Sequence, residues 1–415
     1  QTLTPGSSEF YNLTTTGSST AVTLAAAITI ANDLTIASSS SLDVSGSNHA
    51  IGIKGDFANS GTFTDQAGTV TFNGTGAQSI TTGGVGTDND FNNVTITNTG
   101  TLADGSDVQT SDAIKVTGTL DITEGQFMPA TSSDFVNITL SNSNGKLKPA
   151  SGSSITVSGT WNNSGGSSSS FDGNSGTVTF DAGGAQSLTS DGISFYNLST
   201  STGSTDLTIQ DALIVANDLT IAGSTILDAG SNQAISVAGN WSNSGTFTSA
   251  SNTVTFNGGG AQSLSPGSSS FYNLTTATTS TNVTLQADIT VTNDLTIASS
   301  TILDAGSNRG ITIGGNWSNS GTFTDQAGTV TFNGGGAQTL TPGSSEFYNL
   351  TTTGSGTAVT LAAAITIAND LTIASSSSLD VSSSNYAIGI KGNWSNTATF
   401  VDQSGTVTFN GGDAQ

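Results

Sequence analysis

The titratable residues of this chain are few, and they are the first place to look for chemistry. Its 415 residues include one His, six Lys or Arg and 29 Asp or Glu, which gives a net charge of −23. Glycan-cleaving sites need clustered carboxylates, usually with basic groups that stabilise developing charge. The position of His49 is occupied in other internal repeats by Gln233, Arg309 and Tyr386. A position that accepts four such different side chains is expected to be an exposed loop. We therefore predict no catalytic residues and no enzyme.

Four aspartates, each preceded by Asn, recur once per repeat: Asp33, Asp218, Asp294 and Asp370. At that spacing they cannot pair with one another. We predict that they make turns, with each side chain accepting hydrogen bonds from nearby backbone amides. Calcium is the alternative, because Asp, Asn and carbonyl oxygens are its usual ligands. No EF-hand loop or glycine-aspartate nonapeptide is present, so we predict no cofactor and keep a structural calcium as the alternative.

Composition and motifs exclude several other classes of partner. No P-loop, dinucleotide-binding glycine pattern, zinc-ligand spacing or nucleophile elbow occurs. An acidic chain has no electrostatic affinity for nucleic acid or anionic lipid, so we predict no nucleic-acid partner. No run of 18 apolar residues exists, which argues against membrane insertion. The chain has no Cys, which is compatible with an extracellular location without establishing it.

An internal repeat organises the whole chain. Thr-Val-Thr-Phe begins at residues 69, 177, 253, 329 and 406, at steps of 108, 76, 76 and 77 residues. A fixed period of this size indicates a repeat architecture. We predict one continuous solenoid over residues 1–415, with units at about 1–77, 78–185, 186–261, 262–337 and 338–415. The second unit is 32 residues longer, near 125–158, and this insertion is either extra coils or an excursion that contacts a ligand or a neighbouring filament.

Aromatic residues fall into columns of this repeat. One column holds Phe57, Trp161, Trp241, Trp317 and Trp394, and another holds Phe72, Phe180, Phe256, Phe332 and Phe409. Two further columns hold Phe63, Phe171, Phe247, Phe323 and Phe400, and Phe10, Phe91, Phe195, Phe271 and Phe347. We predict that these columns are structural and that like residues stack on like along one axis.

The local pattern is that of short strands. Ser, Thr, Asn and Gly alternate with Val, Ile, Leu and Phe at a period of two, and turn residues separate the runs. Expected strands near 22–24, 42–44 and 62–64 suggest a coil of about 20 residues. We therefore predict an all-β fold, a parallel β-solenoid, with tandem antiparallel β-sandwiches as the alternative.

Two observations concern how the chain continues. Residues 1–50 and 338–387 differ at only three positions, and the chain starts and stops at the same phase of its repeat. A free-standing solenoid needs polar caps, which are not evident here. We therefore expect its partner to be itself, head to tail, or further repeats of the same chain.

Three segments carry a family resemblance: Gly315-Asn-Trp-Ser-Asn-Ser-Gly-Thr-Phe323, Gly328-Thr-Val-Thr-Phe-Asn-Gly334 and Phe347-Tyr-Asn-Leu350. With these, and over its whole length, the chain resembles large bacterial β-strand-repeat surface and filament proteins. It is more distantly similar to β-helical adhesins and autotransporter passenger regions. The resemblance implies secretion, surface display or matrix assembly, and hence an extracellular or cell-surface location.

These expectations converge on a structural protein. We expect an extracellular fibre or filament formed by continuation or head-to-tail stacking of β-solenoid segments. The alternative is an adhesin stalk or a carbohydrate- or cell-binding surface protein. A water-ordering surface built from Thr-x-Thr segments is a third idea, although simple alternation also places these Thr side chains outward.

Overall fold

The computed structural model describes residues 1–86, 89–100, 107–201, 203–277 and 280–412. Over these residues the fold is all-β without a helix, and parallel sheets stack as a β-solenoid of about 19 turns. This confirms the predicted fold class. The antiparallel alternative is wrong, because the strand pairs of the described residues are parallel. In the same part of the chain, no helix has the length and apolarity needed to cross a membrane.

Backbone contacts divide the chain into two compact units, Gln1–Ile214 and Val215–Gln415, which are described separately. The first contains β1 (Thr2–Leu3), β2 (Leu13–Thr15), β3 (Thr20–Leu24), β4 (Ile28–Ile30), β5 (Leu34–Ile36), β6 (Ser40–Asp43), β7 (Ile51–Ile53), β8 (Phe57–Asn59), β9 (Thr62–Thr64), β10 (Thr69–Phe72), β11 (Gln78–Thr81), β12 (Asn93–Thr97), β13 (Val108–Thr110), β14 (Lys115–Met128), β15 (Ser133–Leu140), β16 (Gly145–Leu147), β17 (Ile155–Val157), β18 (Thr160–Asn162), β19 (Thr177–Phe180), β20 (Ala185–Thr189), β21 (Ser194–Phe195), β22 (Asn197–Thr200), β23 (Asp206–Ile209) and β24 (Leu213–Val215), inside which the division falls.

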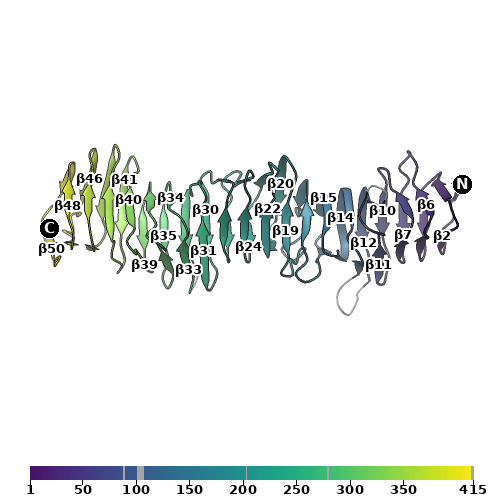
Figure 1. Ribbon diagram of the computed structural model, residues 1–415. Helices are drawn as coiled ribbons and strands as arrows, with labels where there is room; N and C mark the ends of the chain where they lie inside the picture. Colours follow the sequence, from purple (N-terminus) through teal and green to yellow (C-terminus); the bar gives the residue numbers. More distant parts are fainter. Residues whose placement is uncertain (87–88, 101–106, 202, 278–279, 413–415) are drawn as a thin grey trace. The chain divides into compact units, whose positions relative to one another are not determined.

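The second unit contains β25 (Leu219–Ile221), β26 (Ile226–Asp228), β27 (Ile235–Val237), β28 (Trp241–Asn243), β29 (Thr246–Thr248), β30 (Thr253–Phe256), β31 (Ala261–Ser265), β32 (Asn273–Thr276), β33 (Asn282–Leu285), β34 (Ile289–Val291), β35 (Leu295–Ile297), β36 (Ile302–Asp304), β37 (Ile311–Ile313), β38 (Trp317–Asn319), β39 (Thr322–Thr324), β40 (Thr329–Phe332), β41 (Ala337–Thr341), β42 (Asn349–Thr352), β43 (Thr357–Leu361), β44 (Ile365–Ile367), β45 (Leu371–Ile373), β46 (Ser377–Asp380), β47 (Ile388–Ile390), β48 (Trp394–Asn396), β49 (Thr399–Val401) and β50 (Val407–Phe409). Successive strands of each unit follow one another as arrows in Figure 1.

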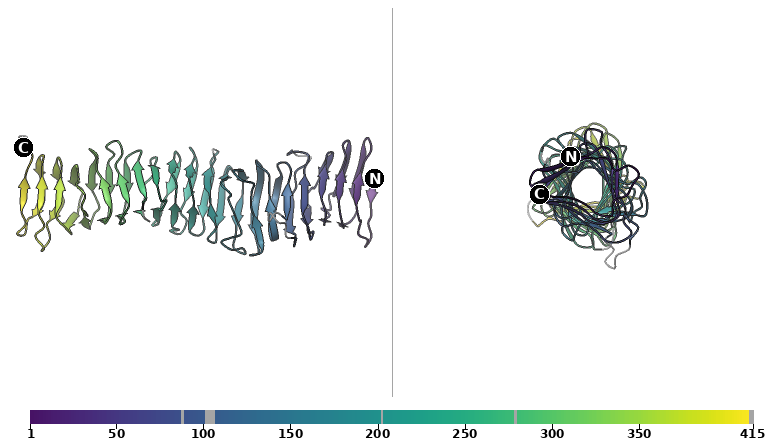
Figure 2. Two further views of the ribbon diagram at one scale, coloured as in Figure 1. Left: turned by 90° about the horizontal axis from the view of Figure 1, so that it is seen from below. Right: turned by 90° about the vertical axis from the view of Figure 1, so that its right-hand side faces the viewer.

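Most strands are three to five residues long because each spans only one side of a coil. In β5, Leu34 and Ile36 are fully buried while Thr35 between them is partly exposed. The same in–out–in pattern recurs in β35 and β45. It follows from the alternation of side chains along a strand. The centre of each coil, which the ribbons of Figure 2 leave open, is therefore filled by buried apolar side chains.

Three strands make one coil, and each pairs with the strand three places further along. In the second unit, β34 pairs with β37, β35 with β38 and β36 with β39. Their registers join like to like in part, as Ile289 to Ile311 and Thr290 to Thr312. Gly315 lies where two coils approach closely, since a Cβ there would be 2.6 Å from the side-chain oxygen of Asp294. Glycine is the residue that permits this approach.

The 76-residue repeat does not contain a whole number of coils. β30 and β40 have the same sequence and are one repeat apart. Between them the chain advances by ten strands, and the isolated bridge at Phe271 takes one further place on a side of a coil, which makes eleven places. Eleven is not a multiple of three, so equivalent strands of successive repeats lie on different sides. Accordingly, β30, β40 and β50 belong to three different sheets.

This geometry makes the expected axial stacking of aromatic columns wrong. The in-register neighbours of Trp317 are Leu295 on one side and Leu340 on the other. The preceding member of its column, Trp241, pairs with Leu219 and Leu264. The physical reason is that one repeat does not contain a whole number of three-sided coils. Equivalent residues of successive repeats therefore lie on different sides.

The insertion of the second repeat forms additional rungs of the solenoid. β14 has 14 residues and pairs with β12, β15 and β16, and β15 pairs onward with β17 and β18. β14 bends at a register shift between Val116 and Thr119. The described residues of the insertion therefore extend the same ladders, as the extra-coil interpretation expects.

Candidate functional site

Aromatic side chains from three different columns meet in groups of three, called aromatic triads here. The ring centroid of Trp317 lies 4.8 Å from that of Phe323 and 5.3 Å from that of Phe347. The indole is edge-on to both rings, at 79° and 62°. This arrangement suits the charge distribution of aromatic rings. The same triad is formed by Phe57, Phe63 and Phe91, by Trp161, Phe171 and Phe195, and by Trp241, Phe247 and Phe271.

The predicted structural aromatics are therefore placed unequally. Eight of the ten residues named for the two main columns are buried: Phe57, Trp161, Trp241, Trp317, Phe72, Phe180, Phe256 and Phe332. The other two lie in the last described coils. Trp394 is half-buried, and Phe409 is 53% exposed. Trp394 contacts Phe400 at 4.8 Å, and the described residues provide no third ring to complete this group.

Beside each triad a buried asparagine bridges a gap in the ladder. The side-chain amide of Asn319 donates hydrogen bonds to the carbonyl of Pro342 (2.9 Å) and to Oγ of Ser345 (3.1 Å). Its oxygen accepts one from the Gly321 amide at 2.9 Å, and Ser345 Oγ accepts one from the Phe323 amide at 2.9 Å. These bonds satisfy backbone groups on a side where β39 has no further strand partner among the described residues.

The asparagine bridge recurs in other repeats. Asn243 donates to the carbonyl of Pro266 at 2.8 Å and to Ser269 Oγ at 3.1 Å. Asn59 donates to the carbonyl of Thr82 at 2.9 Å. The sequence signal for this role was the Asn of Trp-Ser-Asn, but its burial could not be read from the sequence because Asn is usually an exposed turn residue.

A second polar device runs along one corner of the coils. Oδ1 of Asn273 accepts the amide of Asp294 (3.1 Å), Oδ1 of Asp294 accepts that of Asn316 (2.7 Å), and Oδ1 of Asn316 accepts that of Thr339 (2.8 Å). The aspartates predicted to make turns all take part in such bonds. Asp33 accepts from the Asp56 amide, Asp218 from the Asn240 amide and Asp370 from the Asn393 amide. The predicted acceptance of backbone amides is confirmed, but each amide lies 22 or 23 residues away on the next coil, so these bonds join coils and do not close a local turn.

The first-repeat Asp65 is the most perturbed carboxylate. Its Oδ2 accepts the Asn92 amide at 2.6 Å, while its Oδ1 is buried without a hydrogen-bond partner. Burial raises the pKa of Asp65 to about 6, and the Asn92 hydrogen bond opposes this shift. Burial also raises the pKa of Asp181 and of Asp325. These three residues come from separate turns and form no cluster of acids, so they do not make a catalytic pair.

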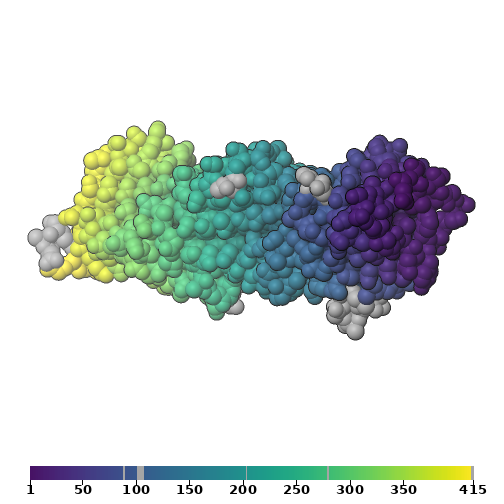
Figure 3. All heavy atoms as spheres, turned by 45° about the vertical axis from the view of Figure 1, so that its right-hand side comes forward, coloured from purple at the N-terminus to yellow at the C-terminus, as the bar shows by residue number. Residues whose placement is uncertain are grey.

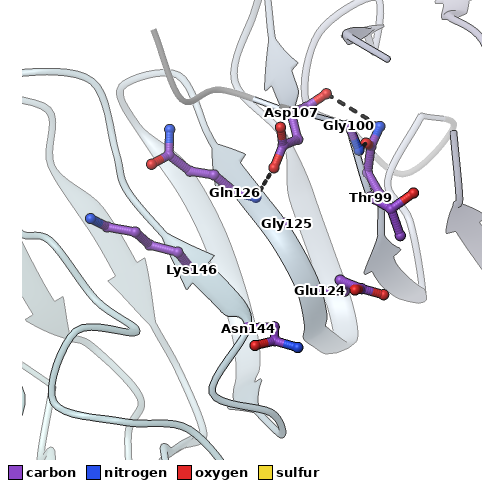
Figure 4. A pocket seen from close by; sticks show the side chains of 9 residues that line it. Thr99, Gly100, Asp107, Glu124, Gly125, Gln126, Asn144 and Lys146 are labelled. Atoms are coloured by element: carbon purple, nitrogen blue, oxygen red, sulfur yellow. Dashed lines mark hydrogen bonds between the residues drawn. The ribbon is translucent and has the colours of Figure 1, made fainter. Parts of the chain in front are cut away.

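A cleft of about 290 Å³ lies at the insertion and is lined by Asp107, Glu124, Gln126, Asn144 and Lys146, together with 98–100 and 125 (Figure 4). Asp107 Oδ2 accepts the Gln126 amide at 2.7 Å. The Asp107 Oδ1 and Gln126 Nε2 atoms are buried without hydrogen-bond partners. Nζ of Lys146 lies 3.9 Å from Oδ2 of Asp172, a residue that does not line the cleft. The cleft is open to solvent, and its lining includes charged and amide side chains.

The remaining sequence candidates are not gathered into a site. His49 and its counterparts Gln233, Arg309 and Tyr386 lie outside strands, directly after turns, and they are half-buried where the sequence predicted exposure. The lysines of the insertion form ion pairs, Lys115 with Asp134 at 3.3 Å and Lys148 with Asp172 at 3.4 Å. No group of three His, Cys, Asp or Glu that could hold a metal ion occurs within the described ranges.

Comparison with known proteins does not assign the chain to a family. No protein-family model, no curated protein and no solved structure gives a significant match. The resemblance to β-strand-repeat surface proteins therefore rests on the sequence motifs alone, whereas the β-solenoid itself rests on the structure. Some described strands pair with another strand on one side only.

These one-sided coils differ from the covered ones in exposure. β48, β49 and β50 each have a strand partner on one side among the described residues. β2 likewise pairs only with β5, and β1 only with β3. Phe332, the counterpart of Phe409, is fully buried where β42 covers it. Figure 3 shows the atoms of the first coils (dark purple) at the surface of the first unit.

Proposed function

We propose that this chain is a structural protein that forms an extracellular fibre or filament, by continuation or head-to-tail stacking of β-solenoid segments. The observation that carries the proposal is that successive coils are joined by parallel ladders and aromatic triads whose contacts recur from one repeat to the next. Strand edges that are neither paired nor covered are a template for further strands, and proteins normally protect them. A repeat that continues its own ladders satisfies these edges.

The mechanism is mechanical. Each coil is held by backbone ladders, by the aromatic triads and by the corner hydrogen bonds, so that it contacts mainly its neighbours. Such an assembly can lengthen without a change in design. We propose no catalytic activity and no cofactor, and we place the protein outside the cell or on its surface, in line with its motif resemblance.

Electron microscopy of negatively stained protein over a range of concentrations tests this proposal. We expect rods or filaments whose mean length grows with concentration, together with a rise in light scattering. The control is the same chain with Phe409→Asp and Val407→Asp, which place two charges on an open strand. Particles that keep one length at every concentration, in wild type and control alike, would contradict self-stacking.

A binding surface is the second candidate, and the cleft at the insertion favours it. Oδ1 of Asp107 would accept a hydrogen bond from a ligand such as a carbohydrate hydroxyl, and Nε2 of Gln126 would donate one to it. A glycan array with wild type and with Gln126→Ala tests this role. Binding that the variant loses would favour an adhesin, and filament formation would be unaffected.

A further inference from the structure

The cleft at the insertion is built around a buried carboxylate, that of Asp107. Its Oδ2 accepts the Gln126 backbone amide at 2.7 Å, and its backbone carbonyl accepts the Gln78 amide at 2.9 Å. Asp107 is 7% exposed, and its Oδ1 has no hydrogen-bond partner among the described residues. Leaving a buried carboxylate oxygen without a partner costs free energy. Asp107 therefore presents an acceptor for a group that the described residues do not supply.

Gly125 makes room for this carboxylate. Its φ is +79°, and a Cβ there would lie 2.9 Å from Oδ2 of Asp107 and closer still to the carbonyl oxygen of Asn98. Glycine tolerates both the positive φ and the close approach. Because of this glycine, β14 passes beside Asp107 without displacing its side chain.

Gln126 adds a donor beside this acceptor. It is 8% exposed, and its Nε2 is buried without a hydrogen-bond partner in the described part of the chain. Figure 4 shows its side chain between those of Asp107 and Lys146. Lys146 is in register with Gln126, but its Nζ lies 3.9 Å from Oδ2 of Asp172, which does not line the cleft. The cleft thus combines an acceptor and a donor on two side chains that are more than nine-tenths buried.

The charge of the lining favours a cationic ligand. Asp107 and Glu124 both line the cleft, and neither forms an ion pair within the described ranges. A hydroxyl group would satisfy the free Oδ1 of Asp107 but would leave its negative charge uncompensated, whereas an ammonium group does both. The net charge of −23 on the whole chain also attracts cations.

The equivalent place in other repeats carries no such pair of side chains. Asp107 and Gln126 directly precede Val108 and Phe127, which are in register. The in-register pairs that occupy the place of Asp107 and Gln126 in the first, fourth and fifth repeats are Ala21 with Ser41, Asn282 with Ile302, and Ala358 with Ser378. None of these joins a carboxylate to a side-chain amide. The ladders therefore form without this pair, so its role is not that of holding the coils together.

From these contacts we infer that the cleft binds a vicinal amino alcohol, in the form of a sugar that carries a free amine beside a hydroxyl group. The ammonium group donates a hydrogen bond to Oδ1 of Asp107, and the neighbouring hydroxyl oxygen accepts one from Nε2 of Gln126. The cleft volume of about 290 Å³ is at the lower end for ligand pockets and suits a single sugar ring. This inference rests on the second candidate function, the binding surface, and specifies its ligand.

Calorimetric titration at fixed ionic strength with four small probes tests the ligand class. The probes are glucosamine, N-acetylglucosamine, glucose and ethanolamine. We expect glucosamine to bind at least tenfold more tightly than N-acetylglucosamine and glucose, which lack the charge. It should also bind at least tenfold more tightly than ethanolamine, which has the amine and the hydroxyl but lacks the ring.

Variants of the cleft test the contacts. Asp107→Asn removes the charge, keeps the shape and should weaken glucosamine binding at least tenfold, whereas Gln126→Ala should weaken it by a smaller factor. Asp206→Asn makes the same change at the corresponding position of the third repeat and should leave binding unchanged. The double variant Asp107→Ala with Gln126→Ser copies the pair at Ala358 and Ser378, so it suits the fold, and it should abolish binding.

The outcomes separate this ligand from the functions proposed above. Equal binding of glucosamine and glucose, lost in the double variant, would overturn the ammonium contact and leave a carbohydrate-binding cleft standing. Ethanolamine that binds as tightly as glucosamine would overturn the sugar as the source of the amine. Glucosamine binding that the variants leave unchanged would overturn the cleft as its site. No binding of any probe would overturn the cleft site together with its ligand, while the fibre function is decided separately by microscopy.

Discussion

The fourth and fifth repeats have nearly the same sequence around their tryptophans, but the two tryptophans are buried to different extents. Residues 315–323 read Gly-Asn-Trp-Ser-Asn-Ser-Gly-Thr-Phe, and residues 392–400 read Gly-Asn-Trp-Ser-Asn-Thr-Ala-Thr-Phe. Trp317 is 1% exposed within a complete triad, whereas Trp394 is half-buried and its ring contacts one described aromatic ring, that of Phe400. The difference is the coil on the far side. Burial of a repeat is therefore completed by the next one, so that a single unit is not an independent folding unit.

The largest expected effect comes from the tryptophan itself. Trp317→Ala removes a buried indole from three coils and should destabilise this region by about 3–5 kcal/mol. Trp394→Ala removes a side chain that is already half exposed, and its cost in the unassembled chain should be much smaller. Hydrogen exchange of the backbone amides in β38 and β41, compared with β48, measures both, because a long repeat array does not unfold as one two-state unit.

Trp317→Phe is the matched control, since Phe57 occupies this position in the first repeat and is 1% exposed. It keeps an aromatic triad and removes an indole nitrogen that is buried without a hydrogen-bond partner. We expect it to cost far less than Trp317→Ala. Equal losses for the two variants, or equal losses at Trp317 and Trp394, would show that the next coil does not determine burial.

A covered turn and an open turn should also differ in their response to pH. Asp65 is 3% exposed beside a covering coil, whereas Asp402 of the same segment is exposed. The folded-state pKa of Asp65 is about 6, above the ordinary value of 3.8, so the folded protein binds the proton more tightly. The corresponding contribution to stability is present below about pH 4 and is lost as the pH rises through about 6. Its size is on the order of 3 kcal/mol.

Asp65→Ser tests this dependence, because Ser249 occupies the same position in the third repeat. Between pH 7 and pH 4, hydrogen exchange in β10 and β12 should slow in wild type more than in the variant, after correction for the intrinsic rates. The same comparison for β30, which follows Ser249 in place of an aspartate, serves as an internal reference. Parallel pH profiles for wild type and variant in β10 and β12 would contradict the assigned pKa.

The contrast between repeats also shows what the sequence could predict. The strands at 28–30 and 34–36 follow from alternation, whereas the bond that Asp33 accepts comes from Asp56, 23 residues away, and turn chemistry predicts local bonds. The spatial arrangement of the repeats could not be predicted from the sequence, because the repeat period gives a number of residues and does not give the number of strands per coil. Each 76-residue repeat takes eleven places on the sides of the coils, so equivalent aromatic residues of successive repeats lie on different sides. The contact between Trp317 and Phe347 became visible only in the structure.

The candidate site depended still more on three-dimensional information. The buried role of Asn319 requires a carbonyl at Pro342 and a hydroxyl at Ser345, which are more than 20 residues away in sequence. The cleft around Asp107 and Gln126 joins strands whose pairing no local pattern indicates.

A smaller effect is expected at the asparagine bridge. Asn319→Ala leaves the Pro342 carbonyl and the Gly321 amide without their partners in a buried place, which should cost about 2 kcal/mol. Asn396→Ala removes only the bond from the Ala398 amide at an exposed strand. Local hydrogen exchange around β39 and β49 compares them. A larger loss at Asn396 than at Asn319 in the unassembled chain would break the comparison between covered and open coils.

The smallest expected effect, and the most general, is that of salt on assembly. Each copy carries a net charge of −23, so two copies repel each other as they approach. Raising NaCl shortens the Debye length from about 30 Å at 0.01 M to about 10 Å at 0.1 M, which weakens that repulsion. The concentration at which light scattering rises should therefore fall a few-fold over this range. CaCl₂ at equal ionic strength is the control, since a further fall would point to calcium ions held by the corner aspartates. An assembly held together by charge pairs would respond in the opposite direction, with salt opposing assembly.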